Sequence, residues 1–381
     1  MIIRNALVFT IEDGFVKKDV AIREGIFSEL AEEVCKKENE EILDGEECYL
    51  IPGLIDIHLH GAVGHDFSDG SMEGVKKILA YELKNGITTI CPTTMTLSEE
   101  ELHSACQNIC VCAEDSVEGK EARISGIHLE GPFISEVKKG AQNASHIVKP
   151  DANMLQSLQD ASGNNIKRIT IAPETEGALE FIEKVSDTVS VSLGHTACSY
   201  ECAKEAFAKG ATQVTHLHNG MPDMHHREPG LVGAAFDAED VMCELICDGI
   251  HVHPAVVRAA FRQLGKERIV LISDSIRATG MPDGEYTLGG LPVTVNKQVA
   301  KLMDGTIAGS VYNLMDCVRN AVNMGISLED AVYCAAYTPA KAIGADDMYG
   351  SIEGGKRGDC VLLQSKDLSI CKVIKKGIIV E

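Results

Sequence analysis

The stretch Leu50-Ile51-Pro52-Gly53-Leu54-Ile55-Asp56-Ile57-His58-Leu59-His60 ends an apolar run on two histidines that are spaced two residues apart. Residues i and i+2 of a strand point to the same side of a sheet, so His58 and His60 can offer both imidazoles to one divalent cation. A lone His-x-His pair is a weak sign, because such pairs also occur in loops. The preceding Pro52-Gly53 and the apolar run predict a buried strand, and this context favours metal binding.

Seven further apolar runs follow, and each becomes polar or glycine-rich at its C-terminal end. Together with the first, they cover residues 54–60, 87–94, 124–133, 166–174, 189–196, 212–219, 244–251 and 268–275. Amphipathic helical patterns fill most gaps, for example at 72–86, 98–115 and 199–210. This alternation predicts an α/β fold, a (β/α)₈ TIM-like barrel with its active site at the C-terminal strand ends. Because several of these strands end in His, Glu or Asp, we expect a metal-dependent hydrolase barrel. An open doubly wound sheet is the weaker alternative, because no GxGxxG follows the first strand.

The two ends of the chain show a different sequence pattern, in which short apolar runs alternate with turns. Residues 1–50 alternate short apolar runs with turns at Asp13-Gly14 and Asp44-Gly45, which predicts a β-meander, and the last residues repeat the pattern. Chain ends often lie close together. We therefore expect residues 1–50 and 346–381 to form one small β-sandwich domain beside a catalytic barrel at 51–345.

Composition argues against several classes of partner. Asp and Glu number 57 against 35 Lys and Arg, and the formal charge of -22 repels nucleic acid and anionic membranes. A small anionic substrate stays compatible with this charge, because a few local cations can hold a phosphate. The 14 cysteines lack CxxC spacing and the first residues lack a secretory pattern, so we expect reduced thiols in a cytoplasmic protein.

Ionisable residues end several later strands. Glu130 precedes a Gly-Pro turn, while His195 and His216 end the fifth and sixth runs. Two histidines on consecutive strands, together with a carboxylate, favour metal ligation over isolated core or loop roles. Asp274 ends the eighth run, where it could be a structural N-cap. We prefer a general acid/base role, because such a carboxylate can take a proton from an activated water and return it to a leaving amine.

Two donor-rich loops, at 225–230 and 248–251, stand out in this acidic chain. A charged loop is usually plain solvated surface. Arg227 and His251 would nevertheless offer an anion two hydrogen-bonding partners, which predicts a phosphate or carboxylate clamp. His128, two residues before Glu130, is expected in the core or behind the ligands.

Taken together, the motifs resemble the N-acetylglucosamine-6-phosphate deacetylase family of the amidohydrolase superfamily, almost from end to end. The resemblance rests on PGLIDIHLHG (52–61), HLEGPF (128–133), KKGAQN (138–143), GHTAC (194–198), THLHNGMPDMHHREPGLVGAA (215–235), DGIHVHP (248–254), SDS (273–275), DGTIAGS (304–310), TPAKAIG (338–344) and GSIEGGKRGD (350–359). This set of motifs is far more specific than one His-x-His pair.

The resemblance implies hydrolysis of the acetamide of N-acetyl-D-glucosamine 6-phosphate by metal-activated water, in amino-sugar catabolism or cell-wall recycling. It implies a metal on Glu130, His195 and His216, and in some members a second on His58 and His60, with zinc, iron, manganese and cobalt all suited. It also implies a homodimer in which Arg227 can serve the neighbouring subunit. The substrate-binding residues that it implies are Ala141, Gln142, Asn219, Gly220, Arg227, Asp248, Gly249, Ile250, His251, Ile307, Ala308 and Gly309.

Three positions depart from the family pattern. Gln142 stands where many members have a histidine, and it can hydrogen-bond an acetamide carbonyl but cannot carry charge. The sequence THLHNGM places His218 and Gly220 where the family usually has Phe and Ala. These changes leave the choice between glucosamine and galactosamine substrates open. The third, SDS for the commoner TDA, keeps Asp274.

Two other functional classes remain as alternatives. Amidohydrolases that open cyclic amides commonly use a carboxylated lysine, and no Lys ends an apolar run where Glu130 stands. A catalytically silent scaffold barrel would typically have lost ligands, whereas every candidate ligand and Asp274 are present. Both alternatives are therefore weaker than the deacetylase hypothesis.

Overall fold

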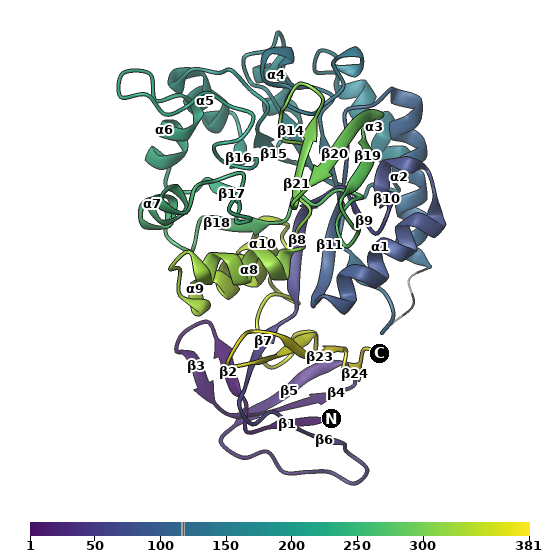
Figure 1. Ribbon diagram of the computed structural model, residues 1–381, viewed down its shortest axis with the longest axis vertical. Coiled ribbons are helices and arrows are strands. Elements are labelled where there is room, and N and C mark those ends of the chain that lie inside the picture. Colours follow the sequence, from purple (N-terminus) through teal and green to yellow (C-terminus); the bar gives the residue numbers. More distant parts are fainter. Residues whose placement is uncertain (116, 118) are drawn as a thin grey trace.

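The structure is a computed structural model that describes residues 1–115, 117 and 119–381. Figure 1 shows a barrel surrounded by helices and, below it, a smaller group of β-strands where both chain termini lie. None of the described helices has the length and apolar character that a lipid bilayer crossing requires.

A nearly closed parallel barrel forms the larger part. Its strands follow chain order, with β8 beside β11 and then β13, β14, β15, β16, β17 and β18. Their bounds are β8 (Leu54–Leu59), β11 (Ile87–Thr94), β13 (Ile127–Glu130), β14 (Ile166–Ile171), β15 (Ser190–Leu193), β16 (Ala211–Val214), β17 (Met242–Ile246) and β18 (Ile269–Ile272), with β12 (Arg123–Ile124) extending the sheet beside β11. Each barrel strand overlaps a predicted run, so the barrel prediction is confirmed.

The first and last barrel strands meet through the backbone. Asp274 N, just after β18, donates to His58 O in β8 at 3.0 Å. This bond brings the predicted acid/base residue beside the His-x-His pair. The barrel seam therefore assembles part of the site.

Helices cover the outside of the barrel (Figure 1). They are α1 (Met72–Lys84), α2 (Glu99–Glu114), α3 (Ala152–Ala161), α4 (Ala178–Val185), α5 (Tyr200–Ala208), α6 (Gly230–Asp237), α7 (Pro254–Leu264), α8 (Leu314–Asn323), α9 (Leu328–Val332) and α10 (Thr338–Ala342). Ser98 and Ser199 cap α2 and α5, since their hydroxyls accept from Glu101 N at 3.4 Å and Cys202 N at 3.1 Å. Gly86 ends α1 with φ +83°, a left-handed conformation that glycine adopts without steric cost.

The terminal segments form two sheets, ordered β5-β4-β1-β6 and β24-β23-β22-β7-β2-β3. Their strands are β1 (Ile2–Arg4), β2 (Leu7–Thr10), β3 (Gly14–Lys17), β4 (Asp19–Arg23), β5 (Ile26–Ala31), β6 (Ile42–Asp44), β7 (Cys48–Pro52), β22 (Cys360–Gln364), β23 (Ile370–Lys375) and β24 (Ile378–Ile379). The meander prediction was wrong, because β1 pairs in parallel with β6 and β2 in parallel with β7. Phe27 of one sheet and Leu362 of the other share one apolar core, as in a sandwich. The boundaries at residues 50 and 346 stay a prediction.

A three-stranded sheet outside the barrel was not anticipated. It contains β19 (Gly284–Leu288), β20 (Leu291–Asn296) and β21 (Val299–Leu302), inserted after β18. It lies over the upper part of the barrel in Figure 1. A shorter pair, β9 (Gly61–Ala62) and β10 (His65–Asp66), follows β8.

One acidic side chain in α1 is costly to bury. Glu82 is fully buried, and among the described residues neither of its carboxylate oxygens has a hydrogen-bond partner. Burial raises the pKa of Glu82 well above its usual value, and the nearby charges of Asp56 and Asp316 raise it further. The folded state therefore binds this proton more tightly than the unfolded chain does.

We expect Glu82→Met to raise the free energy of unfolding by about 1–3 kcal/mol, because it removes an unpaired buried polar group. Because folding raises the pKa of Glu82, its carboxyl destabilises the fold least at low pH, where it is protonated in both states. The folded protein loses stability as pH rises through the folded pKa of Glu82. The gain should therefore be larger at pH 8 than at pH 5. Urea unfolding at both values measures it, with Glu73→Met on the exposed side of α1 as the matched control. Equal gains at the two pH values would contradict the assigned protonation.

Candidate metal and active site

A cavity of about 250 Å³ is lined by residues at the C-terminal strand ends and in the loops beyond them. The predicted site residues that line it are His60, Glu130, Ala141, Gln142, His195, His216, Asn219, Gly220, His251, Asp274, Ile307 and Gly309. Met95, Gly140, Leu288 and Thr306 line it as well and were not predicted. Leu288 and Thr306 come from the unanticipated three-stranded insertion and the loop after it.

Glu130, His195 and His216 form the first group of converging donor atoms. Glu130 Oε1 lies 3.2 Å from His195 Nε2 and 3.0 Å from His216 Nε2. The two Nε2 atoms are 3.1 Å apart. Ligand atoms on one tetrahedral zinc ion are separated by about 3.3 Å when each lies 2.0–2.1 Å from the metal. The spacing therefore fits a single metal ion.

The second group contains His58, His60 and Asp274. Asp274 Oδ1 lies 3.3 Å from His60 Nε2 and 3.7 Å from His58 Nε2. Glu130 reaches this group too, since its Oε1 is 3.2 Å from His58 Nε2 and its Oε2 is 3.3 Å from His60 Nε2. The Glu130 carboxylate thus lies between the two groups, where it could bridge two ions.

The protonation pattern of the histidines tests whether a cation fits. His195 Nδ1 lies 3.0 Å from Lys138 O, and His216 Nδ1 lies 3.1 Å from Asn219 O. A carbonyl oxygen only accepts, so each Nδ1 carries the hydrogen and each Nε2 presents a lone pair. Two lone pairs that face each other at 3.1 Å need a proton or a metal ion between them. The arrangement therefore fits a divalent metal.

The charge environment of the second group, His58, His60 and Asp274, also favours a bound cation. Burial alone would lower the pKa of His60, but hydrogen bonds and charge interactions with Asp274 and Glu130 raise it to about 10. His60 Nδ1 lies 3.2 Å from Thr93 O, so its Nε2 is the atom that faces the carboxylates. The site attracts positive charge at the position where a second metal would bind.

Three of the residues at this site have an unusual backbone conformation. His195, His216 and Asp274 have φ values of +46°, +29° and +50°, in the left-handed region that non-glycine residues seldom adopt. Such strain costs roughly 1–3 kcal/mol per residue and tends to cluster at functional sites. Its occurrence at three strand ends around one cavity supports a functional role for these residues.

The family profile described as Amidohydrolase family matches residues 49–380. The chain belongs to the amidohydrolase family. It is 36% identical over 380 residues to an N-acetylglucosamine-6-phosphate deacetylase from Lysinibacillus sphaericus, covering 99% of this chain and 97% of that protein. An N-acetylgalactosamine-6-phosphate deacetylase from Escherichia coli O157:H7 is 36% identical over 318 residues, covering 83% and 84%. The structure of a mutant N-acetyl-D-glucosamine-6-phosphate deacetylase from Mycobacterium smegmatis, in complex with N-acetyl-D-glucosamine-6-phosphate, matches with a TM-score of 0.92 at 31% identity, covering 100% and 99%.

In this amidohydrolase, Gln142 is engaged at both ends of its amide. Its Nε2 donates to Glu130 Oε2 at 2.5 Å, and its Oε1 accepts from Thr96 N at 2.8 Å. A contact with a substrate carbonyl would require one of these bonds to open. The visible role of Gln142 is to hold the Glu130 carboxylate in place.

The predicted anion clamp is only partly assembled. His251 lines the cavity, and its Nδ1 lies 2.6 Å from Asp248 Oδ2. Burial lowers the pKa of His251, but the hydrogen bond to Asp248 raises it above its usual value overall. Arg227 instead lies on an exposed loop with its Nη1 2.6 Å from His226 Nε2, outside the described lining residues.

The remaining predicted substrate residues support the cavity wall. Ile250 N donates to Asp248 Oδ1 at 2.8 Å, across Gly249 in a left-handed turn with φ +78°. Ala308 is buried, and its N donates to Ala300 O in β21 at 3.0 Å. These residues shape the loops that present His251 and Ile307.

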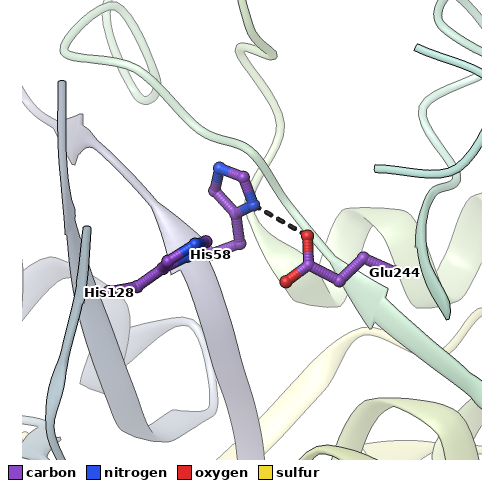
Figure 2. Close-up of side chains that lie close together, drawn as sticks. All are labelled: His58, His128 and Glu244. Carbon is purple, nitrogen blue, oxygen red and sulfur yellow. Dashed lines mark hydrogen bonds and ion pairs between the residues drawn. The ribbon is translucent and has the colours of Figure 1, made fainter. Parts of the chain in front are cut away.

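Two charged residues beneath the site escaped the sequence analysis. Glu244 in β17 and Arg168 in β14 are both buried, and Figure 2 shows Glu244 facing His58. Burial would raise the pKa of the Glu244 carboxyl, but the positive charges of Arg168 and His58 hold it below its usual value. The available signal was charge within a largely apolar strand: MCELI has one charged residue, Glu244, and IKRITI has two neighbouring ones, Lys167 and Arg168, of which alternation can bury only one.

Proposed function

We propose that this amidohydrolase removes the acetyl group from N-acetyl-D-glucosamine 6-phosphate, giving D-glucosamine 6-phosphate and acetate. The observation that carries the proposal is the position of Asp274, whose Oδ1 lies 3.3 Å from His60 Nε2 in the cavity that Glu130, His195 and His216 also line. The deacetylases among its relatives support the choice of reaction.

A divalent metal held by Glu130, His195 and His216, with His58 and His60 available for a second, would supply Lewis-acid chemistry that acidifies water and polarises a carbonyl oxygen. We infer zinc, iron, manganese or cobalt, since imidazole and carboxylate ligands suit each of them. The Asp274 carboxylate accepts the proton of water as the water attacks the acetamide carbon. It then returns the proton to nitrogen as the C–N bond breaks, because an amine anion is a poor leaving group.

The sugar phosphate would be held at the outer side of the cavity. Its phosphate would contact His251, which Asp248 orients at 2.6 Å. Arg227, exposed in one chain, would reach this phosphate from the second subunit of a homodimer. Ala141, Asn219, Gly220, Ile307 and Gly309 line the cavity and would surround the sugar ring. We place the enzyme in the cytoplasm, where free thiols such as its cysteines persist.

N-acetyl-D-galactosamine 6-phosphate is the second candidate substrate. One relative of equal identity is an N-acetylgalactosamine-6-phosphate deacetylase. His218 and Gly220 also alter the loop after β16, and Gly220 lies against the cavity. The two substrates differ in the configuration at one hydroxyl group, which contacts from this loop could distinguish.

Release of free amine from the two phosphorylated sugars and from unphosphorylated N-acetylglucosamine tests the proposal. Metal-stripped protein would be reconstituted separately with zinc, iron(II), manganese and cobalt, and the stripped protein serves as the control. We expect the glucosamine phosphate to give the highest kcat/KM, and Arg227→Ala to raise KM for the phosphorylated sugars only. Preference for the galactosamine phosphate would select the second candidate, and no turnover of any sugar with any metal would reject both.

A further inference from the structure

His58, His128 and Glu244 form a third group with metal-ligand side chains, deeper in the barrel (Figure 2). The Glu244 carboxylate of this group, however, already has hydrogen-bond and ion-pair partners on both oxygens. Glu244 Oε1 lies 2.5 Å from Arg168 Nη2, and Glu244 Oε2 lies 2.8 Å from His58 Nδ1 and accepts from His216 N at 3.1 Å. The guanidinium of Arg168 takes the place that a cation would have in this group.

Arg168 is held rigidly and out of solvent. Its side chain is 0% exposed, its Nε donates to Gln213 Oε1 at 2.8 Å, and its Nη1 donates to Ile57 O at 2.9 Å. Apolar side chains of neighbouring strands, such as Ile57 and Ile246, fill another part of this interior. Removing one member of a buried ion pair leaves the other charge uncompensated, which costs far more than the intact pair gains.

We infer that Arg168 and Glu244 are positioning residues that fix His58 for metal binding. Glu244 accepts the Nδ1 hydrogen of His58, which leaves Nε2 as the ligand atom and sets the plane of the ring. Glu244 also accepts from the backbone N of His216, but the ring of that histidine is oriented by Asn219 O, so the ring that depends on Glu244 is that of His58. Arg168 keeps that carboxylate charged and in place.

His128 completes the support of His58 without binding a metal itself. Its Nε2 lies 2.8 Å from Thr170 Oγ1. Its ring packs edge-to-face on that of His58, with centroids 4.7 Å apart and planes at 83°. His58 is thus held by a hydrogen bond on one side and by ring packing on another.

This inference rests on the metal site of the proposed function, but it can be tested without a substrate. Metal-stripped protein is titrated with cobalt(II) and followed by its visible absorbance. His58→Ala first identifies the cobalt-binding step that depends on His58. We expect Arg168→Met to weaken that step by roughly 10–100-fold, as removal of supporting partners does elsewhere, and to leave the other step within about threefold.

A double variant separates positioning from a general structural effect. Arg168→Met combined with Glu244→Gln removes both buried charges and keeps an oxygen that can accept from His58 Nδ1, so cobalt affinity should recover by about tenfold or more over Arg168→Met alone. Arg268→Met is the matched control, since Arg268 caps backbone carbonyls of Ala235 and Ala238 away from the site. Unchanged cobalt binding in folded Arg168→Met, or equal weakening of both steps without recovery in the double variant, would overturn the inference. If the variants change cobalt binding as expected but the wild-type protein does not release acetate from the sugar phosphate, the result counts against the proposed function alone.

Discussion

Replacing Asp274 by Asn should lower kcat for deacetylation by roughly 10²–10⁴-fold while the metal at Glu130, His195 and His216 stays bound. An amide cannot accept the proton of the attacking water, and so it cannot return a proton to the leaving nitrogen. Asp274 is placed by its backbone, since its N donates to His58 O at 3.0 Å and its O accepts from Ser310 N at 2.7 Å. Asn also tolerates the left-handed φ of +50° better than other replacements do. The substitution therefore removes the proton chemistry and keeps the geometry.

Steady-state kinetics and elemental analysis of the metal content measure this outcome together. Asp240→Asn, an equivalent change at an exposed position, should leave both quantities unchanged. The acid/base role predicts a fall in kcat with little change in KM, because Asp274 acts on the reacting atoms. Loss of all bound metal from Asp274→Asn would show instead that Asp274 is a ligand first. Near-normal turnover would remove it from the mechanism.

The barrel could be predicted because its strands are buried on both faces. Such strands appear in the sequence as continuous apolar runs, and the polar residue that ends each run marks the mouth of the barrel. Glu130, His195, His216 and Asp274 were predicted in this way, and the structure brings them around one cavity. Short local sequence patterns were therefore enough to predict these four residues.

The features that escaped prediction depend on pairing between distant residues. The parallel pairing of β1 with β6 and of β2 with β7 cannot be read from local alternation, which shows strands but not their partners. Arg168 and Glu244 are 76 residues apart in the sequence, and only the folded structure shows that they form an ion pair. Gln142 lines the cavity, and its substrate contact stays a prediction, but its bonds to Glu130 and Thr96 could not be read from the sequence.

Glu130→Gln should weaken metal binding at both groups, by about 3–5 kcal/mol or roughly 10²–10⁴-fold in affinity, because it removes the one charge that the groups share. Glu130 Oε1 lies within 3.2 Å of the Nε2 atoms of His58 and His195, and Oε2 is 3.3 Å from His60 Nε2. A glutamine keeps the size of the side chain but supplies one weak acceptor and one donor in place of two anionic oxygens. This effect differs from that of Arg168→Met, which should reach only the His58-dependent step.

Cobalt titration of Glu130→Gln resolves the two groups, and deacetylation should fall in parallel with metal content. Glu176→Gln is the control, since Glu176 forms an exposed ion pair with Lys149 at 2.5 Å, and surface pairs contribute little. If Glu130→Gln weakens only one cobalt step, the carboxylate belongs to one metal, and the contact of Oε2 with His60 is incidental. If both steps weaken together, Glu130 joins the two groups into a single binuclear centre, and the retained His58 and His60 are part of the working site.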